Sequence, residues 1–424
     1  MKRMMNRDAI TKVQATILVT VVVIAAIVGV AYYLILPKPP EKPKEVKIAF
    51  LTPFTGPSAF LGDLARKGVD QAINEINSGG GIRSLGGLNI TVIYYDSGGT
   101  ATEATSALQR VLSLYKGELS ATLLYMASGH VIACTEITER EKMTTIAGGW
   151  ADIITEKGYK YLFRVCPRSS AINNWGIPAL IEMAKSAGVP LKKVAFLYDD
   201  NPSTIALIDA LRKLSVEYGL ELVLDEMWTA PLPDATPLVT KLADAKPQLF
   251  LCYSMSLQDM VLILGKVKEM GLKITTVFYG ATAMNPQFRE VVGPFCEGLL
   301  LLSDWNIINN EVNFKFKEAY MKRYGVTWIP KDSIGTYAMI WIFKEAIEKA
   351  ASTDPEKIKE ALATIDITSG PATLIYGRVR FDSKGDTVDA APLLAQWQNV
   401  KGVLQPVTIF PSKWATGTVI WPKY

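Results

Sequence analysis

The stretch Lys47-Ile48-Ala49-Phe50-Leu51 returns almost unchanged as Lys193-Val194-Ala195-Phe196-Leu197. Each copy is a short apolar run typical of a buried strand, and each opens a long alternation of apolar runs and amphipathic helical patterns. Such an alternation predicts a parallel sheet with helices on both faces. The repeat therefore predicts an α/β protein with two similar lobes and a cleft between them, where the loops at the strand ends are free to carry function.

The remaining patterns extend both lobes. In the first, we expect strands at 46–51, 88–95, 121–126 and 144–147, and helices at 61–76, 101–114 and 132–140. In the second, we expect strands from 193, at 222–227, 249–253 and 276–279, and helices at 204–217, 238–245 and 257–270. Further helices are expected at 310–324, 333–351 and 355–364, and a β-like tail at 376–381, 393–398 and 418–421.

The body of the chain carries no charge bias. The formal net charge of +4 arises from residues 1–45, which hold seven basic and three acidic residues, so basic and acidic residues are equal in number from Val46 onward. A balanced body offers no electrostatic footprint for nucleic acid, which excludes that class of partner. With 424 residues and 49% hydrophobic content, the chain is long enough for two domains with substantial cores.

Residues 15–36 form an uncharged apolar run before the body. As a helix, the run is long enough to cover the roughly 30 Å hydrocarbon core of a bilayer. Lys2, Arg3, Arg7 and Lys12 precede it, which predicts that residues 1–14 are cytoplasmic and that the body lies on the extracytoplasmic side of the cell membrane. We expect a retained single-pass anchor, with a cleaved signal peptide as the alternative. Residues 37–45, rich in Pro and Lys, are expected to be a stiff linker.

The residues that common catalytic and metal sites need are missing from the sequence. His130 is the single histidine, and no G-x-S-x-G, Walker or H-E-x-x-H motif occurs. Asp199-Asp200 follows a predicted strand, where paired acids usually form turns and helix caps. We therefore expect no enzymatic activity, no cofactor and no metal.

Four isolated cysteines lie in apolar runs without metal-ligand spacing: Cys134, Cys166, Cys252 and Cys296. Free cysteine behaves as a small hydrophobe, so we expect these residues to be buried and reduced. One or two disulfides are the alternative, because the number of cysteines is even and the body is expected outside the cytoplasm.

Several segments carry a resemblance to a known family. They are KIAFLTPFTGP at 47–57, AINEIN at 72–77 with the glycines after it, YLFR at 161–164, VAFLYDD at 194–200, RFD at 380–382 and APLLAQW at 391–397. In this order and at this spacing, residues 46–424 resemble the solute receptors of branched-chain amino acid type ABC importers, which have the type I periplasmic-binding-protein fold.

The resemblance implies three hinge crossings between the lobes, with 46–165 and 300–370 in lobe one and 166–299 and 371–424 in lobe two. A small solute would be captured between lobes that close over it, and no bond in it would be broken. The receptor would deliver this solute to ABC permease membrane subunits and their ATPase subunits. A ligand-sensing ectodomain of the same fold is the alternative, and an extracellular hydrolase is a third hypothesis.

The resemblance also implies which loops contact the ligand. Lobe one would contribute Phe54, Phe60 and Leu61 from its first loop, Ser128, Gly129 and His130 from a helix start, and Gly149 and Trp150 from a second loop. Lobe two would contribute Ser203, Tyr253 and Thr282.

Two of these positions depart from the pattern of amino acid-binding relatives. Trp150 lies where those relatives carry a small residue and a threonine that hold the ligand's α-carboxylate and α-ammonium, and its ring would stack on the ligand or pack between the lobes. Thr282 lies near the position of an acid that pairs the ammonium, and an uncharged threonine cannot replace that ion pair. The sequence therefore leaves open an amino acid-like solute, an aromatic or aliphatic carboxylate, or an amide.

Overall fold

The computed structural model describes residues 7–35, 44–56 and 58–422. The chain forms two compact units, residues 1–44 and residues 45–424. In the first unit, helix α1 spans Arg7–Ile35. Within the described residues, none of the helices has both the length and the apolar content needed to cross a membrane, so the predicted transmembrane span is not supported. Most of the predicted linker, residues 37–43, falls outside the described residues.

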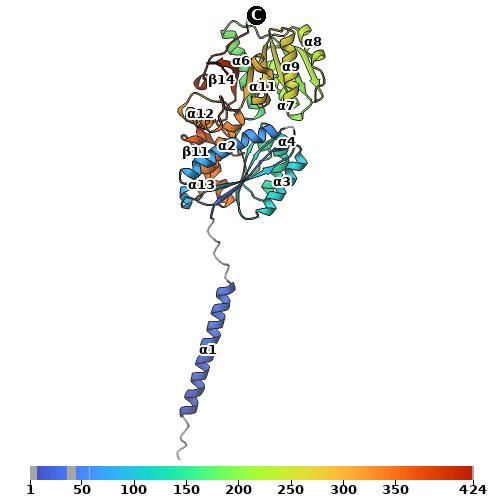
Figure 1. The fold of residues 1–424 in the computed structure, drawn as a ribbon. Helices are drawn as coiled ribbons and strands as arrows, with labels where there is room; N and C mark the ends of the chain where they lie inside the picture. Colours follow the sequence, from blue (N-terminus) through green and yellow to red (C-terminus); the bar gives the residue numbers. More distant parts are fainter. Residues whose placement is uncertain (1–6, 36–43, 57, 423–424) are drawn as a thin grey trace, which may run out of the picture. The chain divides into compact units, whose positions relative to one another are not determined.

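Lobe one is built on a parallel sheet of five strands in the order β2-β1-β3-β4-β5. Figure 1 shows helices on both sides of this sheet. Its strands are β1 Val46–Thr52, β2 Ile90–Asp96, β3 Leu119–Tyr125, β4 Thr145–Gly148 and β5 Leu162–Arg164. Its helices are α2 Ala59–Ser78, α3 Ala101–Leu114, α4 Ser128–Arg140 and α5 Ile153–Glu156. Neighbouring residues of β1 point to opposite faces, because Phe50 packs in the cluster that contains α2 whereas Leu51 packs in the cluster that contains α3 and α4. The prediction of a parallel sheet covered on both faces is confirmed for this lobe.

Lobe two is built on seven strands in the order β14-β13-β10-β9-β8-β6-β7. They are β6 Lys193–Asp199, β7 Glu221–Trp228, β8 Leu249–Tyr253, β9 Thr275–Tyr279, β10 Leu300–Ser303, β13 Leu393–Val400 and β14 Val403–Phe410. Strands β6 to β10 are parallel, but β13 is antiparallel to both β10 and β14. The prediction of a wholly parallel sheet is therefore wrong for lobe two. Lys401 and Gly402, with φ of 53° and 84°, form a two-residue hairpin turn that reverses the chain.

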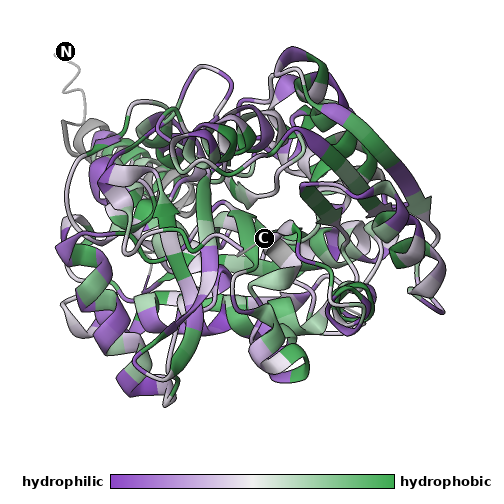
Figure 2. Ribbon diagram, turned by 90° about the horizontal axis from the view of Figure 1, so that it is seen from above, coloured by the Kyte–Doolittle hydropathy of each residue, from purple (hydrophilic) through white to green (hydrophobic). Residues whose placement is uncertain are grey.

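Helices pack on the lobe-two sheet in two groups. They are α6 Ser169–Ser186, α7 Pro202–Glu217, α8 Thr236–Ala245, α9 Leu257–Glu269, α10 Gly280–Ala283 and α11 Pro286–Val292. Helix α6 packs on α7, while α9 packs on both α8 and α11. Figure 2 shows mostly apolar strands in the interior and polar residues on the outer helices.

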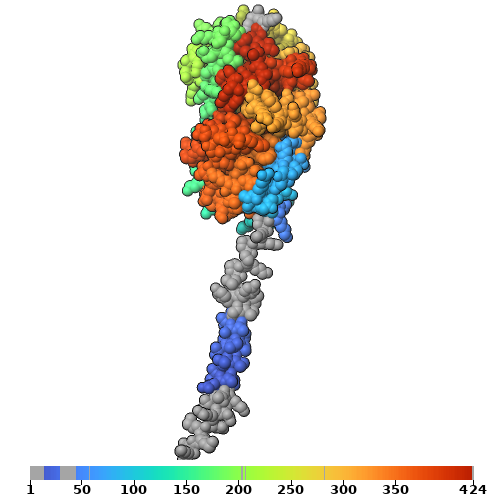
Figure 3. All heavy atoms as spheres, turned by 90° about the vertical axis from the view of Figure 1, so that its left-hand side faces the viewer, coloured from blue at the N-terminus to red at the C-terminus, as the bar shows by residue number. Residues whose placement is uncertain are grey.

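Three late helices follow β10: α12 Glu311–Tyr324, α13 Lys331–Ala350 and α14 Pro355–Ala363. Helix α13 packs along α2, so the chain returns to lobe one, and Figure 3 shows late residues beside the α2 region on one face. Short elements complete the body: strands β11 Asp366–Ile367 and β12 Val379–Arg380, and single 3-10 turns at Arg83–Leu85, Gly293–Cys296, Pro371–Leu374 and Ser412–Trp414.

The chain passes between the lobes three times, at 165–168, 304–310 and 381–392. Because β10 pairs with β9, residues 300–303 belong to the lobe-two sheet and not to lobe one, to which the prediction assigned them. The third crossing follows β12, which pairs with β11, so it begins after residue 380 and not at 370.

The predicted last strand at 418–421 does not form. Side-chain amides of β13 hydrogen-bond to the backbone of this segment, and within the described residues no strand-to-strand backbone hydrogen bonds form there. Gln396 Nε2 donates to the Ile420 carbonyl at 2.7 Å, and its Oε1 accepts from the Ile420 N–H at 2.8 Å. Gln398 Nε2 donates to the Thr418 carbonyl at 2.7 Å.

All four cysteines are free in the structure and buried, which confirms the prediction that they are buried. Burial raises the pKa of the Cys134 and Cys166 thiols to about 12, so both stay protonated.

Candidate functional site

Loops from both lobes enclose a cavity of about 80 Å³, which we call the inner cavity. Its walls come from the carboxyl ends of β3, β4 and β9, from segments that follow β8 and β10, and from the starts of α2, α4 and α13. The carboxyl ends of parallel strands are where α/β proteins place their ligand sites. The lining residues are Leu61, Tyr125, Met126, Ala127, Ser128, Gly148, Gly149, Trp150, Met255, Tyr279, Asp304, Trp305, Lys331 and Asp332.

The lobe-one wall is formed where α4 begins. Ser128 is the first residue of this helix, and its Oγ accepts hydrogen bonds from the N–H groups of Trp150 and Ala151 at 3.1 and 3.2 Å. The serine therefore ties the second loop of lobe one to the helix start. Its own hydroxyl hydrogen can still be donated, and the first N–H groups of a helix suit a carbonyl or carboxylate oxygen.

Trp150 bridges the lobes at the cavity wall. Its Nε1 donates to Asp304 Oδ2 at 2.9 Å, and its ring meets the Tyr279 ring edge-on with centroids 4.8 Å apart. Only 7% of the residue is exposed. Packing between the lobes, one of the two roles expected for Trp150, is thus present, and stacking on a ligand stays a prediction.

Three buried charged groups meet at this wall. Lys331 Nζ lies 3.3 Å from Asp304 Oδ1 and 3.2 Å from Asp332 Oδ1, and the Tyr125 hydroxyl donates to Asp332 Oδ1 at 2.5 Å. Burial alone would lower the pKa of Lys331, but the two carboxylates outweigh it and raise that pKa, so the ammonium stays charged. We call Asp304, Lys331 and Asp332 the charged triad.

Aromatic rings surround the charged triad. Lys331 Nζ lies 5.8 Å from the Trp150 ring centroid and 5.6 Å from that of Trp305. Trp305 also stacks on Tyr125, with centroids 6.2 Å apart. Gly335 of α13 makes room for this indole, because a Cβ there would lie 1.7 Å from the Trp305 ring. Rings at these distances favour a positive charge.

A larger groove of about 890 Å³, the outer groove, lies beside the inner cavity and shares Met255 with it. Lobe one contributes Ser58, Phe60 and Gly99, and lobe two contributes Asp199, Asp200, Asn201, Ala230, Met255, Ser256, Leu257, Gln258, Val261, Gln287 and Val291. Asp199 Oδ2 accepts hydrogen bonds from the Ser254 hydroxyl and the Met255 N–H, both at 2.8 Å, which fits the turn-forming role expected of the paired acids.

The predicted site residues separate into three groups. Four of them line the inner cavity: Leu61, Ser128, Gly149 and Trp150. Phe60 lines the outer groove. The other residues whose side chains are described line neither cavity: Phe54, Gly129, His130, Tyr253 and Thr282. The side chain of Ser203 lies outside the described part of the chain.

The residues away from the cavities have other contacts. The Phe54 ring packs edge-on against Tyr94, and Tyr253 packs on Tyr279 behind the cavity wall. The Thr282 hydroxyl donates to the Ser254 carbonyl at 2.9 Å. Burial lowers the pKa of His130, and within the described residues its buried Nδ1 has no hydrogen-bond partner. Gly129 lies in the first turn of α4, beside Ser128.

Of the other ten lining residues, Ala127 and Gly148 directly precede predicted ones, and sequence reasoning missed eight: Tyr125, Met126, Met255, Tyr279, Asp304, Trp305, Lys331 and Asp332. Asp304 and Trp305 directly follow the apolar run that becomes β10, so the rule that α/β sheets carry ligand sites at strand ends would have found them. Lys331 and Asp332 directly precede the helix predicted at 333–351, and their spacing gives no local signal.

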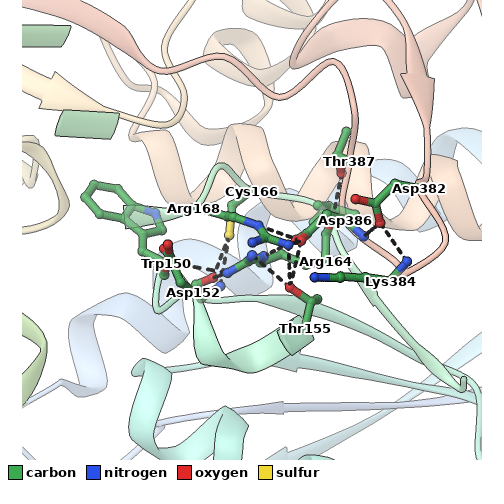
Figure 4. Close-up of polar contacts among 12 residues, drawn as sticks. Trp150, Asp152, Thr155, Arg164, Cys166, Arg168, Asp382, Lys384, Asp386 and Thr387 are labelled. Carbon is green, nitrogen blue, oxygen red and sulfur yellow. Dashed lines mark hydrogen bonds and ion pairs between the residues drawn. The ribbon is translucent and has the colours of Figure 1, made fainter. Parts of the chain in front are cut away.

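A second buried ion pair fixes the loop that carries Trp150 (Figure 4). Arg164 in β5 is fully buried, and its Nε donates to Asp386 Oδ1 of the third crossing at 2.6 Å. Its Nη1 donates to the Ala151 carbonyl at 2.7 Å, and Arg168 also pairs with Asp386. This group joins the first and third crossings, and within the described residues no group of three or more His, Cys, Asp or Glu side chains is placed to hold a metal ion.

Comparisons with known proteins agree with this architecture. A family model described as "Periplasmic binding protein" matches residues 45–402. The chain is 27% identical over 393 residues to the Leu/Ile/Val-binding protein homolog 7 of Brucella suis, an alignment that covers 89% of this chain and 94% of that protein.

Two solved structures share the fold. The branched-chain amino acid transporter substrate binding protein LivJ from Streptococcus pneumoniae, in complex with isoleucine, superposes with a TM-score of 0.72 at 21% identity and covers 86% of this chain and 100% of that one. A solute binding protein of an ABC transporter from R. palustris, in complex with benzoate, gives a TM-score of 0.72 at 17% identity over 89% of this chain and 98% of that one. The chain therefore belongs to the periplasmic binding protein family, whose members are solute receptors and not enzymes.

Proposed function

We propose that this chain captures a small solute between its lobes and delivers it to an ABC importer. The observation that carries the proposal is the inner cavity, whose walls come from both lobes and from the crossing after β10. A solute held there would gain contacts from both lobes only when they are together, so it would stabilise the closed arrangement. The partners would be the membrane subunits of a permease and its ATPase subunits.

The relatives show how widely the solute can vary in this fold, since one complex holds isoleucine and another benzoate. We propose a solute of comparable size for this chain: an amino acid-like molecule, an aromatic or aliphatic carboxylate, or an amide. The aromatic walls, Tyr125, Trp150, Tyr279 and Trp305, suit any of these classes as an apolar surface.

A thermal-shift screen of the full-length chain in mild detergent tests capture. Amino acids, aromatic acids, amides and sugars would be added singly, and we expect a selective subset to raise the melting temperature. A solute present at a hundred times its Kd stabilises by about 2.7 kcal/mol, which is a shift of about 3 °C for a body of this size. The capture proposal fails if no small solute shifts the transition while a protein partner does.

We propose that the body lies on the extracytoplasmic side of the cell membrane and that residues 15–36 direct it there, as a retained anchor or a cleaved signal. The support is the uncharged apolar run and the four basic residues before it.

Labelling of intact cells tests this placement. An amine-reactive reagent that cannot cross membranes should modify exposed lysines of the body, such as Lys185, without lysis of the cells. Mass spectrometry of the purified N-terminus separates an anchor from a cleaved signal. Labelling that requires lysis would contradict the proposal.

A further inference from the structure

The formal charges of the charged triad do not cancel. Asp304, Lys331 and Asp332 are all at most 3% exposed and carry two formal negative charges against one positive charge. Another buried ion pair, Arg164 with Asp386, to which Arg168 also binds, does not line the cavity. A buried charge in excess is costly unless something pairs with it, so the inner cavity is prepared for a positive charge.

One carboxylate oxygen is available for that charge. Asp332 Oδ1 accepts from Tyr125 and faces Lys331, but Asp332 Oδ2 receives no hydrogen bond from any residue that the structure describes. Asp304, by contrast, uses both oxygens, since Oδ1 accepts from the Trp305 N–H and Oδ2 from the Trp150 indole. Asp332 lines the cavity, so its second oxygen is an acceptor open to a donor on the solute.

The outer groove beside the inner cavity also carries negative charge. The outer groove carries Asp199 and Asp200, and no Lys or Arg is found among its described lining residues. A cleft lined by negative charge concentrates cations and repels anions. A carboxylate entering alone would meet four aspartates and a single lysine that is already paired twice.

We propose that the solute carries a cationic nitrogen, an organic ammonium or amidinium, which donates to Asp332 Oδ2 between the aromatic rings of the inner cavity. This inference rests on the proposed function and narrows it, because it excludes simple carboxylates. An acceptor group on the same solute can bind the N–H groups and hydroxyl at the α4 start, so a zwitterion is accepted, but the carboxylate is not required.

A panel of amines and matching carboxylates tests whether the solute must carry a positive charge. Binding would be measured with the full-length protein. Calorimetry would compare isoamylamine with isocaproate, and benzylamine with benzoate. We expect the better amine to bind at least about 30-fold more tightly than its carboxylate counterpart, the size of a buried charge pair. Equal or tighter binding of isocaproate or benzoate overturns the inference and leaves the proposed function standing. If no member of the panel or of the wider screen binds, the proposed function fails and the inference fails with it.

Two variants test whether Asp332 is the residue that recognises the amine. Asp332→Asn keeps the shape and the acceptor for Tyr125 but removes the excess charge, and we expect it to lose the preference for the amine. Asp244→Asn removes the same charge from an exposed position of α8 and should bind the amine like the unchanged chain. Melting curves without ligand check that both variants fold. An Asp332→Asn variant that folds and retains the full amine preference would overturn the assignment to Asp332.

Discussion

Replacing Asp386 with alanine is expected to lower the free energy of unfolding by about 3–5 kcal/mol, the range found when one partner of a buried ion pair is removed. Arg164 is fully buried, so the variant leaves its guanidinium without its carboxylate partner. Thr155 loses the acceptor of its hydroxyl at 2.7 Å as well. Natural proteins are stable by only about 5–15 kcal/mol, so this single change should approach the limit of folding. Equilibrium denaturation in urea measures the loss.

A surface pair provides the matched control. Arg212 binds Asp225 through two nitrogens at 2.6 and 2.9 Å, but their side chains are 34% and 25% exposed. Asp225→Ala should therefore cost about 1 kcal/mol or less. Equal losses for the two variants would show that burial of the Arg164–Asp386 pair does not matter.

Lowering the pH should weaken the Arg164–Asp386 ion pair. Burial alone would raise the pKa of Asp386, but the hydrogen bonds and charge of Arg164 outweigh it and hold that pKa below its usual value. A carboxylate whose pKa is lowered in the folded state contributes stability above its unfolded pKa, about 3.9, and loses it as the pH falls through the folded value. The unchanged protein should therefore lose stability below about pH 4, and Asp386→Ala should lose less over the same range.

Much of the fold follows from patterns within single segments. The repeated apolar run, the strand–helix alternation and the late helices are local periodicities, and their elements lie where they are predicted, within a few residues. The direction of β13 is not local, because it depends on which strand the segment pairs with after the third crossing. The segment at 418–421 looks like a strand, yet the amides of Gln396 and Gln398 take its backbone groups.

The candidate site was predictable where it follows strand ends in sequence. Ser128 and Trp150 follow β3 and β4 and reach the inner cavity, as the rule for α/β sheets predicts. Thr282 follows β9 but turns to the Ser254 carbonyl, since a polar group without a partner is costly when buried. Lys331 and Asp332 come from a helix that returns from the far end of the chain, so only the assembled fold brings their charges to Asp304.

Replacing Trp150 with alanine is expected to weaken binding of the captured solute at least about 30-fold, equivalent to the loss of a buried aromatic anchor worth about 2 kcal/mol. The change removes a cavity wall, the edge contact with Tyr279 across the cleft and the indole N–H that Asp304 accepts. Both the solute contact and the closed arrangement would suffer, since lobe one reaches lobe two through this ring. Titration calorimetry with the best solute of the thermal-shift screen measures the effect.

Trp228 separates loss of binding from loss of packing. It is 6% exposed, and its Nε1 donates to the buried Asp259 Oδ2 at 2.9 Å, the same geometry that Trp150 has with Asp304, but it lines neither the inner cavity nor the outer groove. Trp150→Phe and Trp228→Phe each delete one indole donor to a buried carboxylate, so each should cost about 1–3 kcal/mol of stability. Only the change at Trp150 should alter solute affinity, because only Asp304 belongs to the charged triad. If Trp150→Ala binds the solute like the unchanged chain, the ring serves packing between the lobes alone.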